Sequence, residues 1–130
     1  MSVHPFRVAV ESGEFHSIAH LFAEAAVLHS PVAHRPYHGR DVIATIVAAV
    51  AGVLDGFSFE KELTGGQIGA GNGDHALMFR ATVAGMQIQG CDFLHTGEDG
   101  LIDEITVMLR PLKAATVFAE KMRATNAVGG

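Results

Sequence analysis

The chain has 130 residues, a length that fits one domain with its own core, spanning residues 1–130. Its 48% hydrophobic content excludes an intrinsically disordered protein, and a net charge of -5 with nine scattered basic residues argues against a nucleic-acid-binding surface. The single cysteine, Cys91, cannot form an internal disulfide, so we expect a protein of the reducing cytoplasm. We expect no secretory signal, because no charged segment followed by an apolar run opens the sequence. We expect no membrane span, because the longest apolar stretch, 42–54, is too short to cross a bilayer.

The first third of the chain predicts two short helices and then an extended segment. The first helix is expected to begin at Pro5 and to end before Gly13. The second is expected over Glu14–Phe22, where apolar residues recur at i, i+3, i+4 and i+7. We expect Val27–Ser30 to be extended and 33–39 to form a loop.

The clearest helix is predicted over Asp41–Asp55, where apolar residues form one face and Gly56 follows as a stop. Beyond it the hydrophobic period changes from 3.6 to two, which predicts strands. The four predicted strands are Phe57–Leu63, Asp74–Ala84, Met86–Thr96 and Leu101–Arg110. They form an antiparallel meander, so the chain is expected to be an α+β protein with helices on a twisted sheet.

Glycine marks the connections between these strands. Ala84-Gly85 and 97–100 are predicted hairpin turns, and 65–73 is predicted to be a longer loop. A last helix is predicted over Leu112–Thr125, and the tail 126–130 is expected to be flexible. A twisted sheet that wraps a long helix leaves a concavity between the two, so we expect an apolar pocket there.

Six short motifs, in this order and spacing, resemble the NTF2-like superfamily in its SnoaL-like and ketosteroid-isomerase-like branch. They are Leu-Phe-Ala-Glu-Ala-Ala-Val (21–27), Ser-Pro-Val (30–32), Pro-Tyr-His-Gly-Arg (36–40), Gly-x-Asp-x-Leu (90–94), Asp-Gly-Leu-Ile-x-Glu-Ile (99–105) and Arg-Pro-Leu (110–112). The resemblance implies a cystatin-like cone, in which three N-terminal helices pack on a curved, mostly antiparallel sheet and a C-terminal helix follows. It also implies a homodimer through the sheet face.

Of the three catalytic residues of ketosteroid isomerases, only one has a matching residue in this sequence. In ketosteroid isomerases an Asp directly before a Pro-Val pair is the general base, and here that place holds Ser30. The place of the oxyanion-binding Tyr on the first helix corresponds to Phe6. The strand Asp that donates a hydrogen bond in its protonated form is matched by Asp92. The steroid-isomerase mechanism is therefore not expected.

Asp92 is the strongest candidate for a catalytic residue. By alternation it shares one strand face with Met86, Ile88, Gly90 and Leu94. A carboxyl group among apolar neighbours is costly to ionise, so we expect its pKa to be raised into the range of a general acid or base near neutral pH. The alternative is an inward Asp that only bonds a backbone N–H or an arginine.

His75 is the second catalytic candidate, because alternation places it on the same face as Leu77 at the rim of the cone. There it is expected to exchange a proton with Asp92 or a substrate, unless it is a solvated histidine beside the glycine-rich loop. A Ser30–His75–Asp92 triad is not favoured, because no G-x-S-x-G nucleophile elbow surrounds Ser30.

The expected ligand-binding residues comprise three polar side chains and a set of apolar ones. The polar side chains are Ser30, Tyr37 and His38. The apolar ones are Phe6, Ile46, Phe57, Leu77, Phe79, Ile88, Leu94, Ile105 and Val107. We also expect Phe59, Phe93 and Phe118 in the core or the pocket wall, and Cys91 in the core or an interface.

Two further groups of residues are assigned structural roles. His16 and His20 stand at i, i+4 spacing, but no H-E-x-x-H motif or third ligand accompanies them, so no metal site is expected. Arg80 and Arg110 are predicted on the outer sheet face, where they are expected to pair with Glu60, Glu62 or Glu104.

Two functions remain open from the sequence. In the first, the chain binds a small, largely apolar metabolite and catalyses cofactor-free proton transfer through Asp92, as an isomerase, cyclase, dehydratase or epoxide hydrolase. In the second, it is a non-catalytic ligand-binding or dimeric interaction module that has kept the cone without its chemistry.

Overall fold

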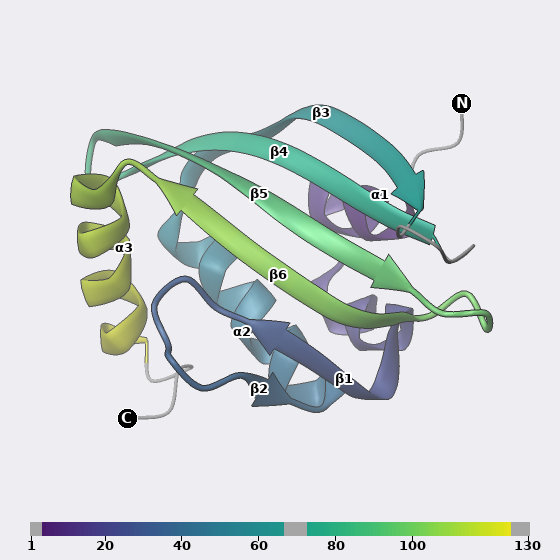
Figure 1. Cartoon of the computed structure of the whole chain (residues 1–130). Helices are drawn as coiled ribbons and strands as arrows, with labels where there is room; N and C mark the ends of the chain where they lie inside the picture. Colours follow the sequence, from purple (N-terminus) through teal and green to yellow (C-terminus); the bar gives the residue numbers. More distant parts are fainter. Residues whose placement is uncertain (1–3, 67–72, 126–130) are drawn as a thin grey trace.

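The computed structural model describes residues 4–66 and 73–125, in which helices cover one face of a curved sheet (Figure 1). In chain order the elements are α1 (Pro5–Ser12), the 3-10 helix η1 (Phe15–Leu21), β1 (Phe22–His29), β2 (Tyr37–His38), α2 (Arg40–Val53), β3 (Asp55–Gly66), β4 (Gly73–Val83), β5 (Met86–Thr96), β6 (Ile102–Arg110) and α3 (Leu112–Ala124). The predicted flexible tail 126–130 and most of the predicted loop 65–73 lie outside the described residues.

The six strands form one sheet in the order β2-β1-β6-β5-β4-β3. The meander from β3 to β6 is antiparallel, as predicted, whereas β1 pairs with β6 in parallel. The β4–β5 hairpin turns at Ala84 and Gly85, whose φ angles of 49° and 80° are both positive, as a two-residue type I′ turn requires. The α+β class and the cystatin-like architecture predicted from the sequence are confirmed.

The N-terminal third differs from the prediction in where the helix gives way to a strand. The predicted helix Glu14–Phe22 is the shorter 3-10 helix η1, and β1 begins at Phe22 instead of at Val27. The apolar spacing is satisfied all the same, because Ile18 is buried from η1 and Phe22 from the first residue of β1. The predicted loop 33–39 contains the two-residue strand β2, which pairs with β1.

The long helix α2 ends at Val53, two residues before the predicted end. Leu54 already has extended φ and ψ angles of -91° and 137°. Gly56, predicted to stop the helix, instead lies inside β3 with a φ of 59°, where the register with β4 shifts. Such a bulge bends the strand and adds twist. β3 therefore starts at the end of α2 and curves over the helical layer.

A second register shift in β3, between Phe59 and Lys61, changes which face the next residues occupy. After it, Glu62 stands across from the buried Leu77 instead of on the outer face. The Oε1 atom of Glu62 lies 3.3 Å from Nη1 of Arg7 on α1. The prediction that Glu62 pairs on the outer face is therefore wrong, because one inserted residue reverses the alternation.

The outer face of the sheet carries a polar network. Arg80 and Glu60 form an ion pair of 2.9 Å, one of the predicted pairs. Arg110 does not pair with any of the predicted glutamates. Its Nη1 donates to Oε1 of Gln89 at 3.3 Å, and Nε2 of Gln89 donates to Glu60 at 3.0 Å. Glu104 instead contacts His29, at 2.9 Å.

Candidate functional site

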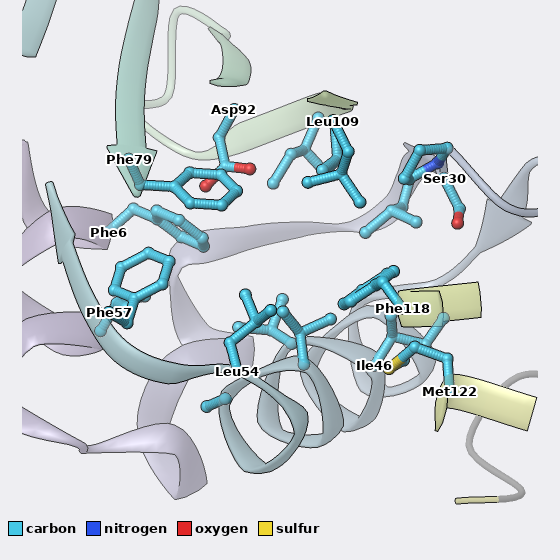
Figure 2. A pocket seen from close by; sticks show the side chains of 18 of the residues that line it. Phe6, Ser30, Ile46, Leu54, Phe57, Phe79, Asp92, Leu109, Phe118 and Met122 are labelled. Carbon is cyan, nitrogen blue, oxygen red and sulfur yellow. The ribbon is translucent and has the colours of Figure 1, made fainter. Parts of the chain in front are cut away.

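A cavity of about 510 Å³ lies between the sheet and the helical layer. Its walls come from most of the fold: α1, β1, α2, β3, β4, β5, β6 and α3 each contribute side chains. In Figure 2, Phe79, Asp92 and Leu109 lie on the sheet side, and Ile46, Leu54, Phe118 and Met122 lie across from them. A cavity of this size and apolar character is typical of small-molecule sites.

Asp92 is the carboxyl group on the sheet side of this cavity. It is 8% exposed and points from β5 into the hollow (Figure 2). Within the described parts of the chain, its side chain has no hydrogen-bond or ion-pair partner. Burial alone raises its pKa from 3.8 to about 7, because the charged form loses hydration and no cation compensates for it.

An aromatic cluster surrounds the end of the cavity nearest Asp92. The rings of Phe57 and Phe79 stack with centroids 4.9 Å apart and an interplanar angle of 29°. Phe59 packs edge-on against Phe57, and Phe6 of α1 packs edge-on against Phe22. Phe6, Phe57 and Phe79 border the hollow, so its wall at this end consists largely of flat apolar rings.

Gly90, two residues before Asp92 on the same face of β5, is required by close packing. A Cβ atom there would overlap Cζ of Phe79 and lie 2.7 Å from the carbonyl oxygen of Met108 and 2.8 Å from Cδ2 of Leu109. The absence of a side chain at Gly90 therefore lets the Phe79 ring lie directly against the strand.

The other polar side chains of the cavity belong to Glu11, Ser30 and Ser58. Glu11 is exposed and pairs with Arg7 at 3.3 Å. The Oγ atom of Ser30 accepts a hydrogen bond from the backbone N–H of Val32 at 3.2 Å, which occupies one of its acceptor positions. Asp92 is therefore the buried ionisable group of this site among the described residues.

The cavity brings together many of the residues selected from the sequence. The selected residues that border it are Phe6, Ser30, Ile46, Phe57, Phe79, Asp92, Ile105 and Val107. The selected residues that lie outside it are Tyr37, His38, His75, Leu77, Ile88 and Leu94. Three of these face inward but are buried in the hydrophobic core instead of lining the cavity: Leu77, Ile88 and Leu94, with exposed fractions of 0, 2 and 1%. Tyr37 and His38 form β2 at the sheet edge, where Tyr37 packs on the core and His38 is exposed.

His75 does not border the cavity that Asp92 borders, contrary to expectation. Its ring packs edge-on against that of His4, with centroids 4.6 Å apart, at the end of the sheet that α1 covers. The side chain of His4 in turn accepts the N–H of Phe6 at 3.0 Å and caps α1. A Ser30–His75–Asp92 triad is therefore not assembled, because only Ser30 and Asp92 share the cavity.

A smaller hollow of about 310 Å³ lies at the same end of the sheet as His75, which borders it. Asp74, His95 and Glu104 also border it, together with Leu63 and Phe93. Nδ1 of His95 lies 2.6 Å from Oδ1 of Asp103, and this hydrogen bond is the main reason that the pKa of His95 is raised.

Neither a metal site nor a membrane-spanning helix is found in the described residues. His16 and His20 are both exposed on η1, and residues 4–66 and 73–125 contain no group of three or more His, Cys, Asp or Glu arranged around a metal ion. In the same ranges no helix is long and apolar enough to cross a membrane.

Phe118 of the C-terminal helix was expected in the core or the pocket wall and borders the cavity, whereas Met122 and Leu109 were not selected from the sequence. Phe118 and Met122 of α3 border the cavity opposite the sheet, and Leu109 borders it from β6. Leu109 had a signal, since it continues the alternation of Ile105 and Val107. Phe118 and Met122 share a helix face at i, i+4 spacing, but that pattern does not say where the face docks.

Comparison with known proteins adds a family to this geometry. Residues 3–105 match the model of the SnoaL-like domain. The chain belongs to the SnoaL-like domain family. Among the curated proteins no match is found.

Two solved structures are similar to this SnoaL-like domain over nearly its whole length. One, from Silicibacter pomeroyi, is an uncharacterized protein conserved in bacteria with a cystatin-like fold. It is 27% identical over 98% of this chain and 89% of its own, with a TM-score of 0.84. The other is a steroid delta-isomerase from Pseudomonas aeruginosa, 26% identical over 98% of this chain and 96% of its own, with a TM-score of 0.78.

A third similar structure is a de novo designed protein with a curved β-sheet. It is 14% identical, with a TM-score of 0.69 over 96% of this chain and 99% of its own. At this identity only the fold is shared. A curved sheet packed on helices therefore assigns no activity by itself, and function has to be argued from the cavity and its carboxyl group.

Proposed function

We propose that this SnoaL-like domain binds a small, largely apolar molecule in the 510 Å³ cavity and uses Asp92 for cofactor-free proton transfer. The reaction types that fit are isomerisation, cyclisation, dehydration and epoxide hydrolysis, in which a proton moves and no electron-transfer group is needed. The observation that carries the proposal is one buried carboxyl group, without a protein partner among the described residues, on the wall of an apolar hollow.

The pKa of Asp92 suits this role. With a pKa of about 7, both the acid and the carboxylate are populated at neutral pH, so one group can take up a proton and return it. An ordinary Asp, fully ionised at pH 7, is a weaker base and has no proton to donate. Because no hydrogen-bond partner of the group is found among the described residues, a polar atom of a ligand would supply one.

The steroid delta-isomerase relative supports isomerase-type chemistry for the fold, but this chain has a different set of groups. The place of the isomerase-type base holds Ser30, and the place of the oxyanion-binding tyrosine holds Phe6. Both border the cavity, and neither side chain ionises near neutral pH. In our proposal the proton therefore moves between Asp92 and the ligand or a water molecule.

The same observation defines the competing function, a binding protein without catalysis. Glu11, the other carboxylate at the cavity in the described residues, is exposed and paired with Arg7, so a second acid–base group inside is lacking there. In that case Asp92 only donates or accepts a hydrogen bond and thereby selects ligands that carry one polar atom.

We propose in addition that two copies pair through the outer sheet face. Leu63, Phe93 and Met108 are 57, 43 and 57% exposed, on β3, β5 and β6. Phe93, expected in the core or pocket wall, points outward because it alternates with Asp92 and Leu94. An apolar surface of this kind on a sheet is typical of a protein–protein interface. The half-buried thiol of Cys91 lies on the same strand.

Binding is tested by thermal-shift screening and NMR titration with steroids, terpenoids and aromatic polyketides. A ligand of the cavity raises the melting temperature, and Asp92→Asn changes its affinity. Asp55→Asn, at an exposed position at the start of β3, is the matched control and should bind like the wild type. Conversion of a bound compound by the wild type and not by Asp92→Asn supports catalysis. Equal binding and equal turnover by the wild type and Asp92→Asn contradict the assignment of the site.

A further inference from the structure

Phe79 and Asp92 are diagonal neighbours on the helix-facing side of the sheet. In the antiparallel β4–β5 pair, Phe79 stands opposite Gly90 and Leu77 stands opposite Asp92. Diagonal positions on one face are roughly 7–8 Å apart, which an aromatic side chain can bridge. Both side chains border the cavity, and Figure 2 shows them on the same, sheet side of it.

The Phe79 ring packs against two other residues. Its tip lies so close to Gly90 that a Cβ atom there would overlap Cζ of the ring. Phe57 stacks on the ring with centroids 4.9 Å apart and an interplanar angle of 29°. The ring is 2% exposed, so water reaches almost none of it. The packing therefore holds the Phe79 side chain in one orientation, on the same face of the sheet as the carboxyl group of Asp92.

We propose that Phe79, packed against Gly90 and Phe57, is a positioning residue for Asp92, because its ring covers the carboxyl group and excludes water from it. This rests on the proposed function, in which Asp92 is the acid–base group. The ring makes no hydrogen bond and carries no charge, so it acts by withholding solvent. It also leaves the cavity side of Asp92 open, which directs a ligand to approach from the space between the sheet and α2.

The test is the pKa of Asp92 in Phe79→Leu, measured from its side-chain carboxyl ¹³C shift during a pH titration. A smaller, flexible side chain admits water, so the pKa of Asp92 is expected to fall by about one pH unit or more toward its ordinary value. Phe118→Leu is the matched control, since it makes the same change in the same cavity on α3, across from the sheet. It should leave the titration close to that of the wild type. Phe79→Met, which fills irregular space better, is used if Phe79→Leu does not fold.

The packing of Phe79 against Gly90 is tested with Gly90→Ala in two backgrounds. In the wild type the added methyl group collides with the Phe79 ring and lowers the melting temperature. In Phe79→Leu the collision with the ring is relieved while those with the Met108 carbonyl oxygen and Leu109 remain, so the loss is expected to be smaller but not abolished. Equal losses in both backgrounds contradict this packing.

The outcomes separate this inference from the proposed function. An ordinary Asp92 pKa in the wild type contradicts the proton-transfer proposal, and the positioning role with it. A raised pKa that is the same in the wild type and Phe79→Leu contradicts the positioning role alone. A raised pKa that falls equally in Phe79→Leu and Phe118→Leu also contradicts it, because any enlargement of the cavity would then be enough to lower the pKa of Asp92.

Discussion

Asp92→Asn is expected to stabilise the protein, and to do so more strongly as the pH rises. The folded-state pKa of Asp92, about 7, lies above the ordinary value of 3.8, so the folded protein holds a proton that the unfolded chain releases between these values. The carboxyl group therefore lowers the free energy of unfolding progressively as the pH rises from about 4 to about 7, and above pH 7 this loss reaches its full size. Asn has nearly the same shape and does not ionise, so it removes this cost.

The difference between the two pKa values corresponds to about 4 kcal/mol at pH 8, since each pH unit is worth about 1.4 kcal/mol. At pH 4, where the unfolded Asp is only about half ionised, the same relation leaves less than about 1 kcal/mol. Urea unfolding of the wild type and Asp92→Asn at pH 4, 6 and 8 gives the two stability curves. Asp55→Asn, at an exposed position, should show no such trend. A stability difference between Asp92→Asn and wild type that does not grow from pH 4 to pH 8 would refute the reasoning.

Two further predictions concern the sheet face and the first helix. Phe93→Lys, in the proposed dimer interface, is expected to give a monomer in light scattering after size exclusion. The control Leu112→Lys, at a position 82% exposed on α3, should remain a dimer. A dimeric Phe93→Lys would show that the interface does not include the outer sheet face. His4→Ala removes the cap of α1 and is expected to cost about 1 kcal/mol in urea unfolding, while His20→Ala, at an exposed position, should cost little. Burial, and to a smaller degree the neighbouring His75, lowers the pKa of His4 below 6.5. The stability of the wild type should therefore fall as the pH drops below 6.5, and it should fall less in His4→Ala. Equal pH dependence in both proteins would exclude a contribution of His4 to the loss of stability at low pH.

The inward direction of Asp92 could be predicted from the sequence because a strand has only two faces. Alternation along 86–96 leaves Asp92 on the face of Ile88 and Leu94, and all three are buried. Alternation does not tell how far along the cone a residue lies. His75 shares that face, yet it packs against His4 beyond the end of the cavity, while Leu77 is absorbed by the core.

Features that depend on register or on docking had no local signal. Glu62 lies on the face of the sheet opposite to the predicted one, because the register of β3 shifts between Phe59 and Lys61. Nothing in the alternating sequence pattern marks that shift. The position of α3 is set by the packing of Phe118 and Met122 against the rest of the core, which is a tertiary effect. The family motifs predicted the fold, whereas the contributions of Leu109 and Met122 to the cavity wall follow from how β6 and α3 pack in three dimensions.

The central claim, a carboxyl group kept from water in an apolar cavity, is tested most directly by titrating Asp92 in the wild type. Carboxyl ¹³C shifts are followed from pH 3 to pH 9, and Asp92→Asn identifies the resonance. The structure predicts a midpoint at a pH of about 7. A midpoint near 4, the ordinary value for Asp, would show that water reaches the group and would contradict the account.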